Sequence, residues 1–145
     1  MEESIVEAVI IRIFNGTDSR QWEMVRNNFA DEVLVDYTSV NGRPASVIKA
    51  DELIESWRAF LPKFKFTFHR QSNFQFEFSE KGCNVFCKGD ALHHLPGAEG
   101  GDLWTVYGTY HFELTKRTGQ WKVTVMKFDL LYQQGNTRLP AIAAT

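Results

Sequence analysis

Four histidines are the residues of this 145-residue chain best suited to acid–base chemistry: His69, His93, His94 and His111. The unperturbed pKa of histidine is about 6.5, so near neutral pH an imidazole can accept a proton and an imidazolium can donate one. His93 and His94 are adjacent in an expected strand and therefore point to opposite faces of a sheet. The spacing to His69 favours His94 as the one of the two that faces inward.

Proton removal next to a carbonyl group is a reaction that such histidines suit. It needs a base for an acidic C–H bond and a proton donor for a departing oxygen. A nearby carboxylate fixes the tautomer of the imidazole and stabilises its charged form. A phenol or hydroxyl group can stabilise a developing enolate, and each such donor contributes about 3 kcal/mol in a dry site.

A metal site is another interpretation of the same residue type. Three histidines can bind zinc or iron, and His69, His94 and His111 would be the ligands. These residues come from different expected strands and form no local chelating motif. The sequence therefore favours a site that holds no metal.

Composition excludes several classes of partner. The net charge is −2 and the pI is about 6.1, with no basic cluster that would bind nucleic acid. No apolar run approaches the ~20 residues of a membrane span, and the N-terminus carries Glu2 and Glu3 where a signal peptide would be basic. Cys83 and Cys87 lie about 13 Å apart on an expected strand, too far for a disulfide. We therefore expect a cytoplasmic protein with no nucleic acid or membrane partner.

Hydrophobic periodicity predicts the elements that must position the site. Apolar residues at helical spacing predict helices at 3–14, 19–30 and 50–61, and alternating patterns predict strands at 33–39, 73–79 and 83–95. The clearest pattern is a pair of long strands at 101–132, joined by a turn at Thr118-Gly119. Alternation across this turn places on one face the side chains of Phe112, Leu114, Trp121, Val123 and Val125. Long strands twist and curl, so helices that cover this apolar face would leave a cone-shaped cavity.

The arrangement of these elements resembles that of a known family. The residues that carry the resemblance are Asp18 before a Trp-containing helix, Asp36-Tyr37 in the first strand, His69 in TFHRQSN, His94 at a strand end, and GQWKV in the last hairpin. Over roughly residues 4–132 the chain resembles the NTF2-like fold, its SnoaL-like branch and, within that branch, scytalone dehydratase. The resemblance implies an α+β cone, in which a strongly curved antiparallel sheet holds three helices from the N-terminal half in its concave face. We expect one domain over 1–135, followed by 136–145 as a flexible tail or a cover for the cavity.

The resemblance also implies a set of site residues. The family's dehydratase removes water from a small hydroxylated ketone without a cofactor. By position, the family's acid falls on Asp18, one tyrosine on Tyr37, the two histidines on His69 and His94, a Ser/Asn pair on Thr109 and His111, and a second tyrosine on Thr17. Threonine in place of that tyrosine predicts related chemistry rather than the same reaction on the same substrate. The implied partners are a small hydrophobic molecule with a carbonyl or hydroxyl group and, through the outer face of the sheet, further copies of the chain in a homodimer or homotrimer.

The resulting hypothesis is a cofactor-independent lyase or isomerase. In it, Asp18 orients His94, His69 is the base, and Tyr37 with Thr109 polarises the substrate oxygen. Simpler interpretations stay open: Asp18 could cap a helix, Tyr37 could be a core residue, and Trp57 could be core or cavity wall. Simple alternation turns His111 away from Phe112 and out of the cone unless a bulge intervenes. A module that binds a ligand without transforming it is the alternative function.

Overall fold

The computed structural model describes all residues from 1 to 145. Its elements, in chain order, are α1 (Glu2–Asp18), α2 (Trp22–Arg26), β1 (Phe29–Asp36), α3 (Thr38–Asn41), β2 (Ser46–Lys49), α4 (Ala50–Phe60), a 3-10 turn η1 (Leu61–Lys63), β3 (Phe66–Ser79), β4 (Gly82–His94), β5 (Leu103–Arg117), β6 (Gln120–Gly135) and α5 (Leu139–Ala143). No helix is long and apolar enough to cross a membrane.

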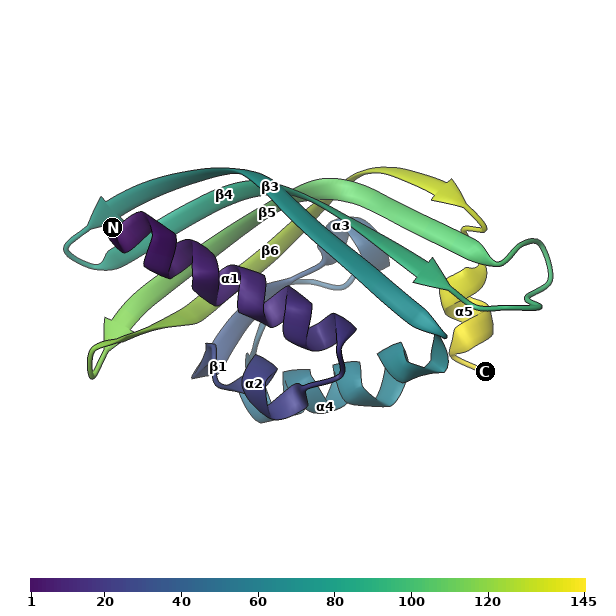
Figure 1. The fold of residues 1–145 in the computed structure, drawn as a ribbon, viewed down its shortest axis with the longest axis horizontal. Helices are drawn as coiled ribbons and strands as arrows, with labels where there is room; N and C mark the ends of the chain where they lie inside the picture. Colours follow the sequence, from purple (N-terminus) through teal and green to yellow (C-terminus); the bar gives the residue numbers. More distant parts are fainter.

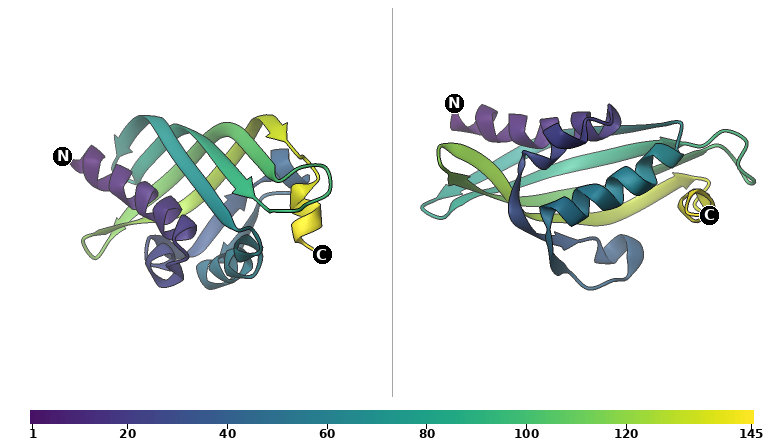
Figure 2. Two further views of the ribbon diagram at one scale, coloured as in Figure 1. Left: turned by 45° about the vertical axis from the view of Figure 1, so that its right-hand side comes forward. Right: turned by 90° about the horizontal axis from the view of Figure 1, so that it is seen from below.

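One six-stranded sheet in the order β2-β1-β6-β5-β4-β3 forms the frame of the molecule. Strands β3 to β6 run as an antiparallel meander, as the sequence predicts, and β1 joins β6 in parallel. The sheet arches over α1, α2 and α4 (Figures 1 and 2). The predicted α+β cone, with N-terminal helices in the concave face of a curved sheet, is therefore confirmed.

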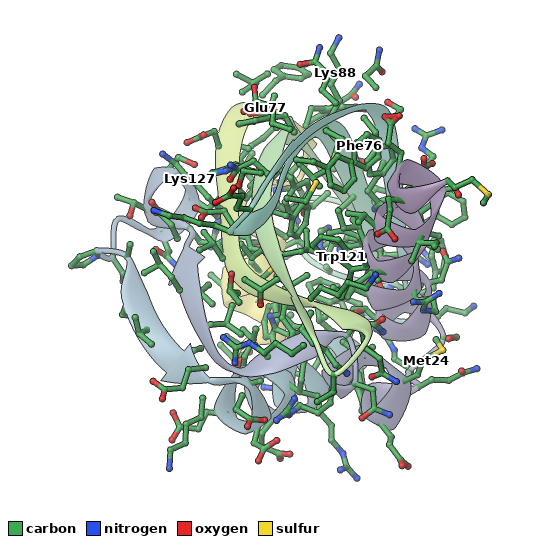
Figure 3. The ribbon with its side chains drawn as sticks, turned by 90° about the vertical axis from the view of Figure 1, so that its left-hand side faces the viewer. Met24, Phe76, Glu77, Lys88, Trp121 and Lys127 are labelled. Carbon is green, nitrogen blue, oxygen red and sulfur yellow. The ribbon has the colours of Figure 1, made fainter.

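The core lies between the concave face and the helices. Helix α1 buries Ile10 and Ile13 against the sheet, where Phe112 and Val123 are also fully buried. Trp121 lies on the side of the sheet that faces α1, whereas Lys88 and Lys127 point away from the core (Figure 3). The indole Nε1–H of Trp121 donates a 2.7 Å hydrogen bond to Glu2, which ties the last hairpin to the start of α1.

The first helix continues past the Asn15-Gly16 pair, at which the sequence predicts its end. Gly16 is buried inside α1, and a Cβ atom there would lie 2.8 Å from side-chain atoms of Met24 and Val25. The glycine therefore serves close packing of α2 against α1 instead of helix termination. The second predicted helix, 19–30, is shortened to α2 because Phe29 already begins β1.

Bulges change which residues of two strands face the core. In the pairing of β5 with β6, Glu113 lies opposite Val125 but Leu114 lies opposite Val123, so β6 contains an extra residue. Met126 is consequently buried, and Val125, which simple alternation places on the core face, is not. A second bulge interrupts the pairing of β3 with β4 at Asn73, whose φ is +59°.

The C-terminal residues 136–145 contain α5, which packs beside the open end of the sheet (Figure 1). Leu139 and Ala143 are buried in the core, and the Asn136 side chain donates hydrogen bonds to the carbonyl oxygens of Glu99 and Gly101. No residue of this segment lines the cavity described below.

Candidate functional site

A cavity of about 280 Å³ opens between the concave face of the sheet and helices α1, α3 and α4. Most of its wall is apolar, formed by Phe14, Val40, Trp57, Phe60, Leu61, Ala91, Trp104, Val106 and Phe128. The polar or ionisable groups in the wall come from Thr17, Tyr37, Asn41, His69, His93 and Tyr110. The cavity therefore suits a small apolar molecule that carries a few polar atoms.

The strongest polar contact in this wall joins the imidazole of His69 to the carboxylate of Asp18. The Nδ1 atom of His69 lies 2.6 Å from Oδ1 of Asp18, and the backbone N–H of His69 donates to Oδ2 at 2.7 Å. Thr67 donates its hydroxyl to Oδ1 at 2.9 Å. A carboxylate only accepts, so Nδ1 of His69 carries a proton and Nε2 is left free. No protein group forms a hydrogen bond with Nε2.

Asp18 does not cap a helix, which is one of the two roles that the sequence allows. It is the last residue of α1, and no side chain caps α2, which begins after Gln21. Its contact with His69 instead connects the end of α1 to β3. The predicted pairing of Asp18 with His94 is wrong, because the carboxylate contacts His69.

The histidine that shares the cavity with His69 is His93, and not His94 as the sequence suggests. The alternation of β4 causes the difference, because Val85 and Cys87 are buried on its concave face and His93 continues the same series. The bulge at Asn73 acts on β3 instead: if the register near the turn, in which Ser79 pairs with Gly82, continued, Arg70 would lie opposite Ala91 and His69 would face outward. The bulge places Ala91 opposite His69, so His69 faces the cavity beside His93, whereas His94 stacks on Phe66 on the other face.

The environment of His93 keeps its imidazole neutral. Burial, together with the charge of nearby His69, lowers the pKa of His93 to about 4. The Nδ1 atom lies 3.1 Å from the carbonyl oxygen of Trp104, which can only accept, so Nδ1 carries the proton. The Nε2 atom of His93 is therefore an acceptor. The rings of His93 and His69 lie 6.1 Å apart.

Two phenols supply hydroxyl groups to the cavity, Tyr37 from the position between β1 and α3 and Tyr110 from β5. Burial raises the pKa of Tyr37 to about 12, with the Tyr110 hydroxyl acting against this shift, and it raises the pKa of Tyr110 well above its usual value. Both phenols are thus neutral hydrogen-bond donors near neutral pH. The Tyr37 hydroxyl also lies 3.9 Å from the sulfur of Met126. Tyr37 lines the cavity together with Tyr110, which the sequence analysis misses.

Thr109 and His111 lie outside the cavity, contrary to their predicted role. They flank Tyr110 on β5 and therefore point to the convex face, where His111 stacks on Phe86 at 4.7 Å. Strand β5 has no bulge of its own that would reverse this alternation. His94 and His111 thus share the convex face while His69 lies in the cavity, so these three histidines do not converge on a metal site.

The other two predicted residues, Thr17 and Trp57, do line the cavity. The Thr17 hydroxyl donates to the carbonyl oxygen of Ile13 at 2.7 Å, as is common inside helices, so its hydrogen is already engaged. Trp57 packs edge-on against Phe29, with ring centroids 6.0 Å apart, and acts as wall.

Gly89 controls how deeply Tyr110 projects into the cavity. A Cβ atom at Gly89 would lie 2.4 Å from Cε2 of Tyr110, so the aromatic ring rests on this glycine. We expect Gly89→Ala to push the ring into the cavity and to weaken binding of an aromatic ketone such as 1-indanone about tenfold. NMR titration measures this affinity, with Thr109→Ala on the convex face as the control. Equal affinity of Gly89→Ala and wild type would contradict the prediction.

Comparisons with known proteins agree with this architecture. Residues 2–127 match the sequence model of the SnoaL-like domain family. The protein Kfla4162 from Kribbella flavida has a similar structure, with a TM-score of 0.89, 21% identity, and coverage of 99% of this chain and 97% of that one. A search of curated protein sequences gave no match.

Two further similar structures carry functional names. One is a candidate scytalone dehydratase from Novosphingobium aromaticivorans, with a TM-score of 0.76, 22% identity, and coverage of 92% of this chain and 87% of that one. The other is a type-3 LinA hexachlorocyclohexane dehydrochlorinase from Novosphingobium barchaimii, with a TM-score of 0.74, 18% identity, and coverage of 94% and 90%. At such identities the likeness shows the fold, and the family match covers most of the sequence. The chain belongs to the SnoaL-like domain family.

Proposed function

We propose that the protein is a cofactor-independent lyase or isomerase that acts on a small apolar molecule with a carbonyl or hydroxyl group. The observation that carries this proposal is the contact between His69 and Asp18 at the wall of an apolar cavity. A carboxylate that accepts the Nδ1 proton makes the opposite nitrogen of the imidazole a better base. A cavity that only held its ligand would need no such pair.

The first step is removal of a proton from the carbon next to the substrate carbonyl. Nε2 of His69 accepts this proton, and the electron pair of the C–H bond moves into an enolate. Asp18 stabilises the imidazolium that forms, as opposite charges in a poorly solvated site attract strongly. The Tyr37 and Tyr110 hydroxyls are placed to donate to the enolate oxygen.

The second step returns the proton. In an elimination, the enolate electrons form a C=C bond while the bond from the β-carbon to the leaving oxygen breaks. The Nε2–H of His69 protonates that oxygen, so water leaves and His69 is neutral again. In an isomerisation, the same proton goes to a different carbon.

His93 has a separate role in this proposal. Its Nε2 atom accepts a hydrogen bond from a substrate hydroxyl and so orients the substrate.

The named relatives support a lyase reaction in outline. A dehydratase and a dehydrochlorinase both eliminate a small molecule, and both names occur among the similar structures. The residues of this cavity carry the specific proposal for this chain.

Exchange of carbon-bound hydrogen tests the proposal without knowledge of the natural substrate. Protein in D2O is incubated with 1-indanone, which can only exchange its α-protons, and with 3-hydroxy-1-indanone, which can also lose water. Loss of the α-proton signals and appearance of the alkene, followed by NMR, would support the proposal. Binding of both ketones without catalysed exchange would instead favour the alternative, a module that only binds its ligand.

We also propose a homodimer or homotrimer, as the resemblance to the family implies. The mass of one chain is 16.7 kDa. Light scattering on the purified protein should therefore give about two or three times this mass. A particle with the mass of one chain at micromolar concentration would contradict the prediction.

A further inference from the structure

Arg20 adopts a backbone conformation that is unusual for its residue type. Its φ is +61°, in the left-handed region that favours glycine. The residue stands just past the end of α1, where the N–H of Arg20 donates to the Thr17 carbonyl at 3.2 Å and the N–H of Gln21 donates to the Gly16 carbonyl at 2.8 Å. These two bonds define a Schellman motif, and glycine is the usual residue at the position of Arg20. A left-handed residue with a side chain stores strain, and such strain clusters at functional sites.

The side chain of Arg20 makes contacts that glycine could not make. Its guanidinium donates to the carbonyl oxygen of Thr17 at 3.3 Å, to the carbonyl oxygen of Leu61 at 3.0 Å and to the hydroxyl oxygen of Thr67 at 3.2 Å. The last contact reaches β3, two residues before His69. Arg20 therefore joins the end of α1, η1 and β3 at the edge of the cavity.

The contact with Thr67 sets the direction of a hydrogen-bond chain. Arginine can only donate, so the Thr67 oxygen accepts from Arg20 and its hydrogen is directed to Oδ1 of Asp18. Oδ1 also accepts from Nδ1 of His69. The order of donors is thus Arg20 to Thr67 to Asp18, and the carboxylate meets His69 in a fixed orientation.

We propose that Arg20 is a positioning residue that acts through Thr67 to orient Asp18 and so holds His69 in the tautomer with a free Nε2. This inference rests on the proposed function, in which His69 is the base. Its structural part, the control of the tautomer, can be measured without any substrate. The ionisable groups around His69 are Asp18 and Arg20 near the end of α1, His93 on β4 and Tyr110 on β5.

Three variants separate the parts of this chain. Arg20→Gly removes the guanidinium but suits the left-handed backbone, so the fold is expected to persist. Thr67→Val removes the hydroxyl with little change of shape and leaves the contact of Arg20 with Leu61. Thr67→Ser keeps the hydroxyl and is the matched control. Thermal unfolding of each variant checks that it is folded.

The readout is the tautomer of His69, obtained from long-range 15N–1H NMR correlations, together with exchange of its Nδ1 proton with water. We expect the wild type and Thr67→Ser to show one tautomer, protonated at Nδ1. Arg20→Gly and Thr67→Val should show mixed tautomers and about tenfold faster exchange of this proton. Catalysed exchange of the α-protons of 1-indanone should fall about tenfold in the same two variants.

The two readouts distinguish failure of this inference from failure of the proposed function. An unchanged tautomer and unchanged proton exchange in folded Arg20→Gly and Thr67→Val would overturn the inference, whatever happens to activity. Changed tautomers in a protein that catalyses no exchange would support the role of Arg20 and contradict the proposed function.

Discussion

Replacing His69 by alanine is expected to lower the rate of catalysed α-proton exchange by about 10²–10⁴-fold. The variant loses the base. Asp18 does not replace it, because its carboxylate accepts hydrogen bonds from the Thr67 hydroxyl and from the backbone N–H of residue 69. The loss corresponds to about 3–5 kcal/mol of transition-state stabilisation. NMR detection of exchange into 1-indanone measures the rate.

A carboxylate variant tests the same contact from the other side. Asp18→Asn can present an amide N–H to Nδ1 of His69, which would favour the tautomer with the proton on Nε2. That nitrogen then cannot accept a proton, so the expected loss is also at least about 10²-fold. His94→Ala, on the convex face, is the matched control and should retain the wild-type rate. Retention of activity in His69→Ala would remove His69 from the mechanism.

Acid is expected to destabilise the folded protein through His93. Burial lowers the pKa of His93 from 6.5 to about 4, so between these values the unfolded chain binds a proton that the folded chain does not. The free energy of unfolding therefore has its full value above pH 6.5 and falls as the pH decreases towards 4. The difference of about 2.5 in pKa corresponds to about 3 kcal/mol, at 1.36 kcal/mol for each unit.

Urea unfolding at a series of pH values measures this loss, and substitution identifies its source. His93→Gln keeps a donor for the Trp104 carbonyl but cannot bind a proton in this range. We expect the dependence on pH between 6.5 and 4 to flatten by about 3 kcal/mol in this variant, with the contribution of the carboxylates unchanged. His94→Gln, one residue away on the opposite face, should keep the wild-type slope. Equal slopes in His93→Gln and wild type would show that His93 titrates as it does in the unfolded chain.

The sequence predicts the architecture well where side chains repeat with a regular period. The alternation of Phe112 and Leu114 with polar neighbours defines β5, and Leu53, Ile54 and Trp57 define the face of α4 that packs on the core. It fails where packing against a distant element decides the outcome. Gly16 stops a helix in most contexts, but here the side chain of Val25 requires it inside α1.

The residues of the site are predicted only in part. His69 and Tyr37 line the cavity, and Asp18 contacts His69. The alternation of Val85 and Cys87 along β4 already turns His93 inward and His94 outward, although the sequence analysis chose His94. The bulge at Asn73, which turns His69 inward, has no clear signature in the sequence. Tyr110 was open to prediction, since it shares the face of Phe112 on β5, and that alternation already turns Thr109 and His111 outward.

The bulge at Asn73 also affects how this chain should be compared with its relatives. One extra residue in β3 decides whether His69 or its neighbour Arg70 faces the cavity, although both are present in the sequence. Deletion of one residue at this bulge would therefore turn the functional histidine out of the cavity without mutating it. Alignments of such chains without gaps will pair residues of opposite faces, so equivalence at this position has to be judged from superposed backbones.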